Sequence, residues 1–280
     1  MMKLILMGDL HYHDIDAAVP GLAEARDAFY GALLGRFMDE EADLHISLGD
    51  LTNYGEATEL QGVYALLARP GRTFVHVLGN HDLYAQTRSE VLKQTGQQRY
   101  HAIETEEAVL VFLDTAKEQD FADWGGWVDD EQLKWLEAEV EASGTKPMLV
   151  FGHHPLYKTT ARSEKPKGSI HPFNEIWRVL GQKQGVGVYF NGHTHVDSIV
   201  SRDNWTFVQV SACLDQPAYR CLELMEEELR ITAVDVDGEE VTAHIPLLHR
   251  HMQHFTPNPV ARGLDSDREC VVSLRAAARL

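Results

Sequence analysis

The feature that most constrains this chain is a series of five short clusters rich in His, Asp and Asn, each directly after an apolar run. An apolar run bounded by turn residues is typical of a buried strand. In an open α/β sheet, ligands bind beyond the carboxyl ends of the strands, so side chains that follow several strands can converge there. The clusters therefore predict one site built from distant loops. They are Asp9-Leu10-His11, Gly49-Asp50, Gly79-Asn80-His81-Asp82, Gly152-His153-His154 and Gly192-His193-Thr194-His195.

Strand, loop and helix alternate through the first part of the sequence, which predicts parallel strands joined by right-handed crossovers. From about residue 186 the pattern changes to short β-rich runs with turns at Asp203-Asn204 and Asp237-Gly238, which favour antiparallel hairpins and a mixed or second sheet. The predicted strands are 3–8, 44–48, 73–78, 109–113, 148–151, 188–190, 198–200, 206–210 and 229–236, and the predicted helices are 23–38, 56–68 and 130–142.

Charge and composition exclude several classes of function. The chain has 280 residues and a formal charge of -18, which argues against general binding to nucleic acid or to an anionic membrane. The apolar run 4–7 is too short for a signal segment. Three cysteines without metal-type spacing fit a reducing compartment, so we expect a cytoplasmic protein. Two irregular segments, 117–128 and 156–172, are expected either to border the substrate or to cover the surface.

The ligand types in the clusters predict a metal centre. Oxygen and imidazole donors without cysteine suit Mn(II), Fe(II) or Zn(II). Asp9 and His11 are two positions apart and project to the same side of an extended backbone, as do His193 and His195. The glycine before each of four clusters allows a sharp exit from the strand.

As an ordered set, the clusters resemble the calcineurin-like metallophosphoesterase family over roughly residues 3–236. The resemblance implies an α/β fold, a four-layer αββα sandwich of two mixed sheets flanked by helices. It would place a metallophosphoesterase domain at 1–245 and leave 246–280 as a C-terminal extension of unknown role. It also implies two divalent metal ions (Mn, Fe or Zn), with Asp50 shared between them; the metal ligands would be Asp9, His11, Asp50, Asn80, His153, His193 and His195.

The same resemblance implies a mechanism in which a hydroxide bridging the two metals attacks phosphorus. His81 would donate a proton to the leaving group, and Asp82 would accept a hydrogen bond from the other ring nitrogen of His81. Asn80 and His81 are expected to contact the substrate, and His154 either to do so or to have a structural role. We expect His13 at the surface and the tail histidines 244, 249, 251 and 254 in solvent.

Two departures from related phosphatases favour a small phosphodiester as substrate. Protein phosphatases of the family have an Arg where this chain has Tyr54, and purple acid phosphatases have a metal-binding Tyr where it has Asn53. The charge of the expected site also balances a diester monoanion better than a monoester dianion. The alternative is a phosphomonoesterase for a nucleotide, sugar phosphate or phosphoprotein, which would need a cation from Arg162, Lys158 or Lys165. A nuclease and a non-catalytic scaffold are less consistent with the acidic charge and the complete ligand set.

Overall fold

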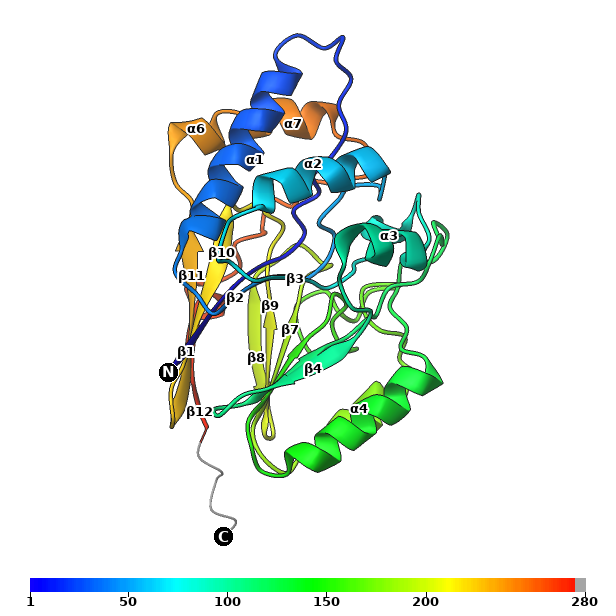
Figure 1. The fold of residues 1–280 in the computed structure, drawn as a ribbon, viewed down its shortest axis with the longest axis vertical. Coiled ribbons are helices and arrows are strands. Elements are labelled where there is room, and N and C mark those ends of the chain that lie inside the picture. Colours follow the sequence, from blue (N-terminus) through cyan, green and yellow to red (C-terminus); the bar gives the residue numbers. More distant parts are fainter. Residues whose placement is uncertain (275–280) are drawn as a thin grey trace.

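The computed structural model describes residues 1–274. Two six-stranded mixed sheets pack against each other, and helices cover the outer face of each, as the resemblance implied. Figure 1 shows α1 and α7 on one side of the molecule and α4 on the opposite side. The predicted four-layer αββα fold is confirmed.

The first sheet has the strand order β12-β11-β10-β1-β2-β3. Strands β1, β2 and β3 are parallel, whereas β10, β11 and β12 join them as antiparallel neighbours. The carboxyl ends of the three parallel strands therefore lie along one edge. The bounds are β1 Met2–Met7, β2 Leu44–Ser47, β3 Phe74–His76, β10 Ala218–Leu224, β11 Glu228–Asp235 and β12 Glu269–Ser273.

The second sheet has the order β4-β5-β6-β7-β9-β8. Its four central strands are parallel, and β4 and β8 are antiparallel edges. The predicted hairpin at Asp203-Asn204 joins β8 to β9 and is confirmed. The bounds are β4 His101–Glu104, β5 Val109–Phe112, β6 Met148–Phe151, β7 Gly187–Asn191, β8 Ser198–Arg202 and β9 Trp205–Gln209.

The three longest helices lie within two residues of their predicted bounds. Helix α1 packs against α2 and α7 outside the first sheet, and α4 packs against α5 outside the second. The helices are α1 Leu22–Asp39, α2 Ala57–Leu67, α3 Arg88–Thr95, α4 Asp130–Ser143, α5 Ile176–Leu180, α6 Glu239–Thr242 and α7 Ile245–His251, with short 3₁₀ turns η1 at His81–Leu83 and η2 at Asp265–Asp267. No helix among residues 1–274 combines the length and the apolar character that a membrane span requires.

Alternation along the strands separates the cores. In β1, Leu4 and Leu6 enter the core between the two sheets, while Ile5 and Met7 enter the core under α1. This is the period of two that a strand buried on both faces requires. Three aromatic rings on neighbouring strands of the second sheet stack in register in the inter-sheet core: Phe112, Phe151 and Phe190.

Parts of the sheet pattern were missed, since strands β4, β10 and β12 lie outside the predicted strands and one predicted turn is absent. The expected hairpin turn at Asp237-Gly238 is wrong, because β11 is followed by α6 rather than by a partner strand. Strand β10 has no clear apolar pattern, since its third residue is Arg220. The fold buries Arg220 beside Asp197, with 3.0 Å between Nη2 and Oδ1. A buried charge needs a partner of opposite charge, and the partner of Arg220 is too distant in the sequence for the pattern of β10 to indicate it.

The end of the described chain is tied to the loop before β8. Arg268 donates from Nη1 to Asp197 Oδ2 over 2.9 Å, and Arg220 donates from Nη1 to the carbonyl of Arg268 over 2.6 Å. Asp197 lies two residues after His195, and its backbone N–H donates to the carbonyl of Ala261. The segment that leads to β12 is therefore packed against one of the predicted ligand loops.

Candidate metal centre

The five predicted clusters meet where the carboxyl ends of the two sheets face each other. Asp9 and His11 follow β1, and Asp50 follows β2; the cluster of Asn80 and His81 follows β3. From the second sheet, His153 follows β6, and His193 and His195 follow β7. The structure thus brings together, from both sheets, all seven side chains that were predicted as metal ligands.

One group of donor atoms comes from Asp9, His11, Asp50 and His195, which all lie within 4.8 Å of one another. The Nε2 atoms of His11 and His195 are 3.1 Å apart, and Nε2 of His195 is 3.4 Å from Oδ1 of Asp9. Oδ2 of Asp50 completes the group at 3.9 Å from Nε2 of His11. Two carboxylates and two imidazoles converging on one point are a suitable ligand set for a divalent cation.

A second group surrounds Nε2 of His153. Oδ2 of Asp50 lies 3.2 Å from that nitrogen, Oδ1 of Asn80 lies 3.1 Å from it, and Nδ1 of His193 lies 3.2 Å from it. Because Oδ2 of Asp50 belongs to both groups, a cation in each would share this carboxylate. The arrangement has the form of a two-metal site, in which a pair of ions lies roughly 3.5–4 Å apart.

Hydrogen bonds on the outer side of the second group fix which atoms face inward. Nδ1 of His153 donates to the carbonyl of Leu48 over 2.9 Å, and Nε2 of His193 donates to the carbonyl of Lys167 over 2.8 Å. Since a carbonyl only accepts, Nδ1 of His153 and Nε2 of His193 carry protons, and Nε2 of His153 and Nδ1 of His193 are the nitrogens that would bind a metal in place of a proton. This second layer of hydrogen bonds is what metal-binding histidines require, so the residues present fit a metal ion.

The backbone of the site is strained. Left-handed φ angles are unusual outside glycine and cost about 1–3 kcal/mol each when the surrounding structure imposes them. Five of the predicted ligands have such angles: Asp9 at 49°, His11 at 51°, Asp50 at 49°, His193 at 73° and His195 at 54°.

Close packing explains the glycines in the clusters. A Cβ on Gly79 would lie 2.2 Å from Oδ1 of Asp50, and one on Gly192 would lie 2.0 Å from Oδ2 of Asp9. Neither distance leaves room for a methyl group without moving the carboxylate. Gly79 therefore allows two neighbouring loops of the first sheet to approach each other, and Gly192 allows a loop of the second sheet to approach one of the first.

Burial and charge set the protonation of the ligands. Burial lowers the pKa of His11 well below its usual value, and burial together with the charge of His153 lowers the pKa of His193 to about 4. Burial alone would raise the pKa of Asp50, but the charges of His153 and His81 hold it well below its usual range. Burial alone would lower the pKa of His153, but the charge and hydrogen bond of Asp50 raise it to about 9. The carboxylate is thus ionised at neutral pH, and it attracts a positive charge to the shared position.

His81 lies beside the first ligand group. Its ring contacts that of His11 edge to face at 4.6 Å, and its backbone N–H donates to Oδ1 of Asp50 over 2.8 Å. Nδ1 of His81 donates to the carbonyl of Asn53 over 2.6 Å. Nε2 is therefore the ring nitrogen left for a substrate, and His81 lines the cavity as expected.

The predicted hydrogen bond between Asp82 and His81 is wrong. Oδ1 of Asp82 accepts from the backbone and hydroxyl of Thr52, both at 2.8 Å, and Oδ2 lies 3.1 Å from Nε2 of His76. Successive side chains of a 3₁₀ turn point about 120° apart, so Asp82 faces inward where its neighbour faces the cavity. Asp82 does not touch the reacting region, and it holds the loop that carries Asn80.

Of the two roles expected for His154, the structure favours the structural one over contact with the substrate. Both of its ring nitrogens are used, Nδ1 by the hydroxyl of Thr115 at 2.9 Å and Nε2 by the carbonyl of Trp124 at 2.9 Å. The ring is fully buried and does not line the cavity. The expected surface position of His13 is wrong too, since His13 is buried against the hydroxyl of Tyr30.

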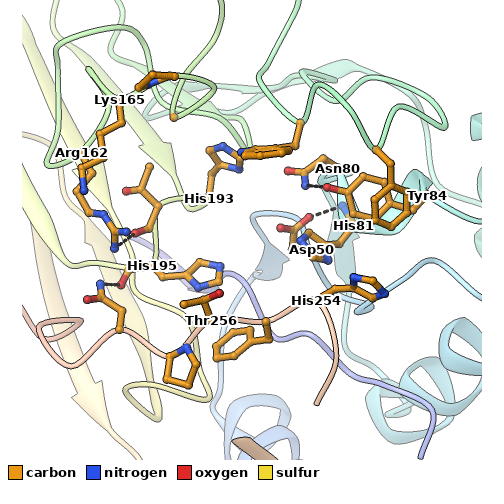
Figure 2. Close-up of a pocket in the computed structure, with 18 of the residues that line it drawn as sticks. Asp50, Asn80, His81, Tyr84, Arg162, Lys165, His193, His195, His254 and Thr256 are labelled. Carbon is orange, nitrogen blue, oxygen red and sulfur yellow. Dashed lines mark hydrogen bonds between the residues drawn. The ribbon is translucent and has the colours of Figure 1, made fainter. Parts of the chain in front are cut away.

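A cavity of about 720 Å³ opens over the ligand groups, within the usual range for small-molecule sites. Both irregular segments border it, 117–128 through Phe121 and Trp124 and 156–172 through Arg162 and Lys165. In Figure 2 the histidines 193 and 195 lie between these two cations and the side chains of Asn80, His81 and Tyr84. Lys158, the third candidate cation, is exposed beside Tyr157 and does not line the cavity.

Residues of the C-terminal segment 254–259 form another wall of the cavity, which the sequence did not indicate. Asn258 donates to the carbonyl of His195 over 2.6 Å, and the ring of Phe255 stacks on that of His195 at 5.1 Å. The expectation that the tail histidines lie in solvent is wrong for His249, which is half-buried, whereas His254 is exposed as expected. Nε2 of His249 lies 3.6 Å from Oδ1 of Asp215, and His254 lines the cavity.

Tyr84 orients Asn80 and was not singled out from the sequence. Its hydroxyl accepts from Nδ2 of Asn80 over 2.7 Å, which turns Oδ1 of the amide towards His153. We expect Tyr84→Phe to weaken metal binding at the second group about 10–100-fold, the usual effect of losing such a partner. Competition between the protein and a chelator for Mn(II) measures this. Tyr100→Phe, beside Trp135 on α4, is the control, and equal Mn(II) affinity of both variants would contradict the assigned role.

Comparisons with known proteins agree with the site. The model of the calcineurin-like phosphoesterase family matches residues 2–197. A probable cyclic nucleotide phosphodiesterase of Rhodopseudomonas palustris is 28% identical over 200 residues, 69% of this chain and 72% of the relative. A glycerophosphodiester phosphodiesterase of Enterobacter lignolyticus is 30% identical over 122 residues, 41% of this chain and 43% of the relative. A dimetal phosphatase from Danio rerio shares the fold with a TM-score of 0.69 and 17% identity, over 84% of this chain and 96% of that one.

Proposed function

This chain belongs to the calcineurin-like phosphoesterase family, and we propose that it hydrolyses a small phosphodiester with the help of two divalent metal ions. The observation that carries the proposal is the shared position of Asp50, whose Oδ2 faces both ligand groups. The proposed metal ligands are Asp9, His11, Asp50, Asn80, His153, His193 and His195. Nitrogen and oxygen donors of this kind suit Mn, Fe or Zn.

Two bound divalent ions supply charge that activates water and stabilises the phosphoryl oxygens. The chain's own residues supply orientation and a proton. The carbonyl of Asn53 holds the ring of His81 through Nδ1, so that Nε2 faces the cavity, where it can give a proton to the leaving oxygen. Tyr84 holds the amide of Asn80 in the orientation that presents its oxygen to the second group.

The names of the relatives support a diester. One is named for cyclic nucleotides and another for glycerophosphodiesters, and both classes are small phosphodiesters. We therefore propose a small-molecule substrate rather than nucleic acid, and this agrees with the formal charge of -18. The three cysteines are free, which supports the proposal of a reducing compartment such as the cytoplasm.

One observation favours the second candidate, a phosphomonoesterase. Arg162 and Lys165 line the cavity, so cations are present that could balance the extra charge of a monoester. Figure 2 places them on the other side of His193 and His195 from His81. That separation places the two cations away from the leaving group, which lies beside its proton donor in either kind of substrate.

The test compares one diester with one monoester in a single preparation. We expect the Mn(II)-loaded protein to hydrolyse bis(p-nitrophenyl) phosphate with a kcat/KM at least about ten-fold above that for p-nitrophenyl phosphate. A chelator should abolish the activity, and added Mn(II) should restore it. A higher kcat/KM for the monoester would support the phosphomonoesterase, and activity that survives removal of the metals would contradict both candidates.

A further inference from the structure

Two basic side chains of the cavity wall have no role in the proposed reaction. Arg162 and Lys165 line the cavity, and neither pairs with a carboxylate anywhere in residues 1–274. Glu164 lies between them in sequence and does not line the cavity. The chain has 43 acidic and 25 basic residues, so the charge of these two side chains is opposite to that of the chain as a whole. Their position at a concave wall indicates that they attract an anion.

The structure holds Arg162 in place before any ligand binds. Its backbone has a left-handed φ of 66°, the same strained conformation as the proposed ligands. Its Nη1 donates to the carbonyl of Thr194 over 3.1 Å, and the hydroxyl of Thr194 donates to the carbonyl of Ala161 over 3.1 Å. The buried hydroxyl of Ser163 donates to the carbonyl of Thr160 over 2.6 Å. A guanidinium fixed in this way binds an anion with little loss of conformational entropy.

The two cations lie too far to one side to serve the leaving group. Figure 2 shows Arg162 and Lys165 beyond His193 and His195, whereas His81 lies on the other side. In an in-line displacement the attacking and leaving oxygens lie on opposite sides of phosphorus, and the substituent that phosphorus keeps lies to the side of that line. Cations that lie away from the proton donor can therefore face the kept substituent but not the leaving one. The cavity of about 720 Å³ has room for such a substituent beside the phosphate.

We propose that Arg162 and Lys165 form a subsite for a second anionic group, a carboxylate or phosphate, on the substituent that the phosphodiester retains. The inference rests on the proposed function. A guanidinium presents parallel N–H groups that match the oxygens of a carboxylate or phosphate, and the ammonium of Lys165 adds a second positive charge. The substrate class is therefore a phosphodiester with an additional anionic arm.

Three p-nitrophenyl phosphodiesters that differ only in the retained arm test this subsite: ethyl, 2-carboxyethyl and 2-phosphonoethyl. All release p-nitrophenolate, so the chemistry at the leaving group is the same. We expect kcat/KM of the Mn(II)-loaded wild type to favour both anionic arms over ethyl by about ten-fold or more, mainly through KM. The phosphonate arm carries the larger charge, so its kcat/KM relative to ethyl should exceed that of the carboxylate arm. Equal kcat/KM for the three arms would overturn the proposal.

Variants of the two cations then test whether the preference for anionic arms depends on them. Arg162→Gln and Lys165→Gln should each reduce the ratio of kcat/KM between the anionic arms and ethyl, and the double variant should bring it close to one. Lys158→Gln lies on the same loop outside the cavity and should keep the wild-type ratio. Arg162 also contacts Thr194, so its replacement could disturb the cavity as a whole. Such damage would lower kcat/KM equally for all three substrates. If both single variants show this equal loss, the subsite is contradicted.

Direct binding separates this inference from the proposed function. Calorimetry should show that the Mn(II)-loaded protein binds 3-phosphonopropionate more tightly than propylphosphonate and that the double variant loses the difference. If none of the three diesters is hydrolysed, the proposed function fails, and this binding difference still decides the subsite. Equal affinity for the two phosphonates would reject it.

Discussion

Replacing Asp50 with asparagine is expected to abolish hydrolysis, with a fall in kcat of about a thousand-fold or more. Oδ2 of Asp50 is shared by both ligand groups, and the second group contains no other carboxylate. An amide keeps the shape of the side chain but removes the negative charge. His153, His193 and Asn80 would then form a neutral set that holds a divalent ion weakly.

Elemental analysis and activity are measured together on Asp50→Asn. We expect less than one metal ion per chain to survive gel filtration, with the circular dichroism spectrum of the wild type. The matched control is Asp43→Asn, at the opposite end of β2, where the carboxylate accepts from the backbone of Lys3. A variant at position 50 that retains wild-type metal content and activity would contradict the shared role.

His81→Ala is expected to show the second large effect, and its size should depend on the leaving group. General acid catalysis contributes about 10²–10⁴-fold when the leaving oxygen is a poor leaving group. An alkyl diester should therefore lose activity by that factor, while bis(p-nitrophenyl) phosphate, whose phenolate leaves without a proton, should lose much less. The orientation of Nε2 towards the cavity, fixed by the bond from Nδ1 to Asn53, is the structural reason.

The measurement compares kcat of the wild type and His81→Ala on a series of diesters with leaving groups of increasing pKa. A steeper dependence in the variant supports proton donation. His251→Ala, an exposed position on α7, serves as the control and should keep the wild-type dependence. An equal loss for every leaving group, or a loss of metal content in His81→Ala, would show that His81 acts by packing against His11 instead.

The ligand clusters could be predicted because their signal is local. Each one follows an apolar run, and the parallel topology carries it to the same edge, so Asp50 and His193 could be placed without knowledge of any contact between them. Asp82 shows the limit of local reasoning. It is adjacent to His81 in the sequence, but the 3₁₀ turn directs it inward to Thr52 and His76.

The part of the cavity wall that the C-terminal segment forms could not be predicted, because its contacts join distant positions. The side chain of Asn53 donates to the carbonyl of Gln253 over 2.8 Å, across 200 residues of sequence. Asn258 reaches His195 across 63 residues. A tail of mixed polar and aromatic residues has no periodicity, so nothing in its pattern indicated that Phe255 would stack on His195. The burial of Arg220 in β10 could not be predicted for the same reason, since its partner Asp197 lies in the distant loop before β8.

The most direct test of the central claim is electron paramagnetic resonance of the chain titrated with Mn(II). If the two ligand groups share Asp50 as proposed, the chain should bind two Mn(II) ions, and the second equivalent should produce the spectrum of an exchange-coupled pair, because the ions lie roughly 3.5–4 Å apart. The coupled signal should be lost in Asp50→Asn. Saturation at one ion per chain, or two ions that give only the spectrum of isolated Mn(II), would contradict the shared dinuclear site.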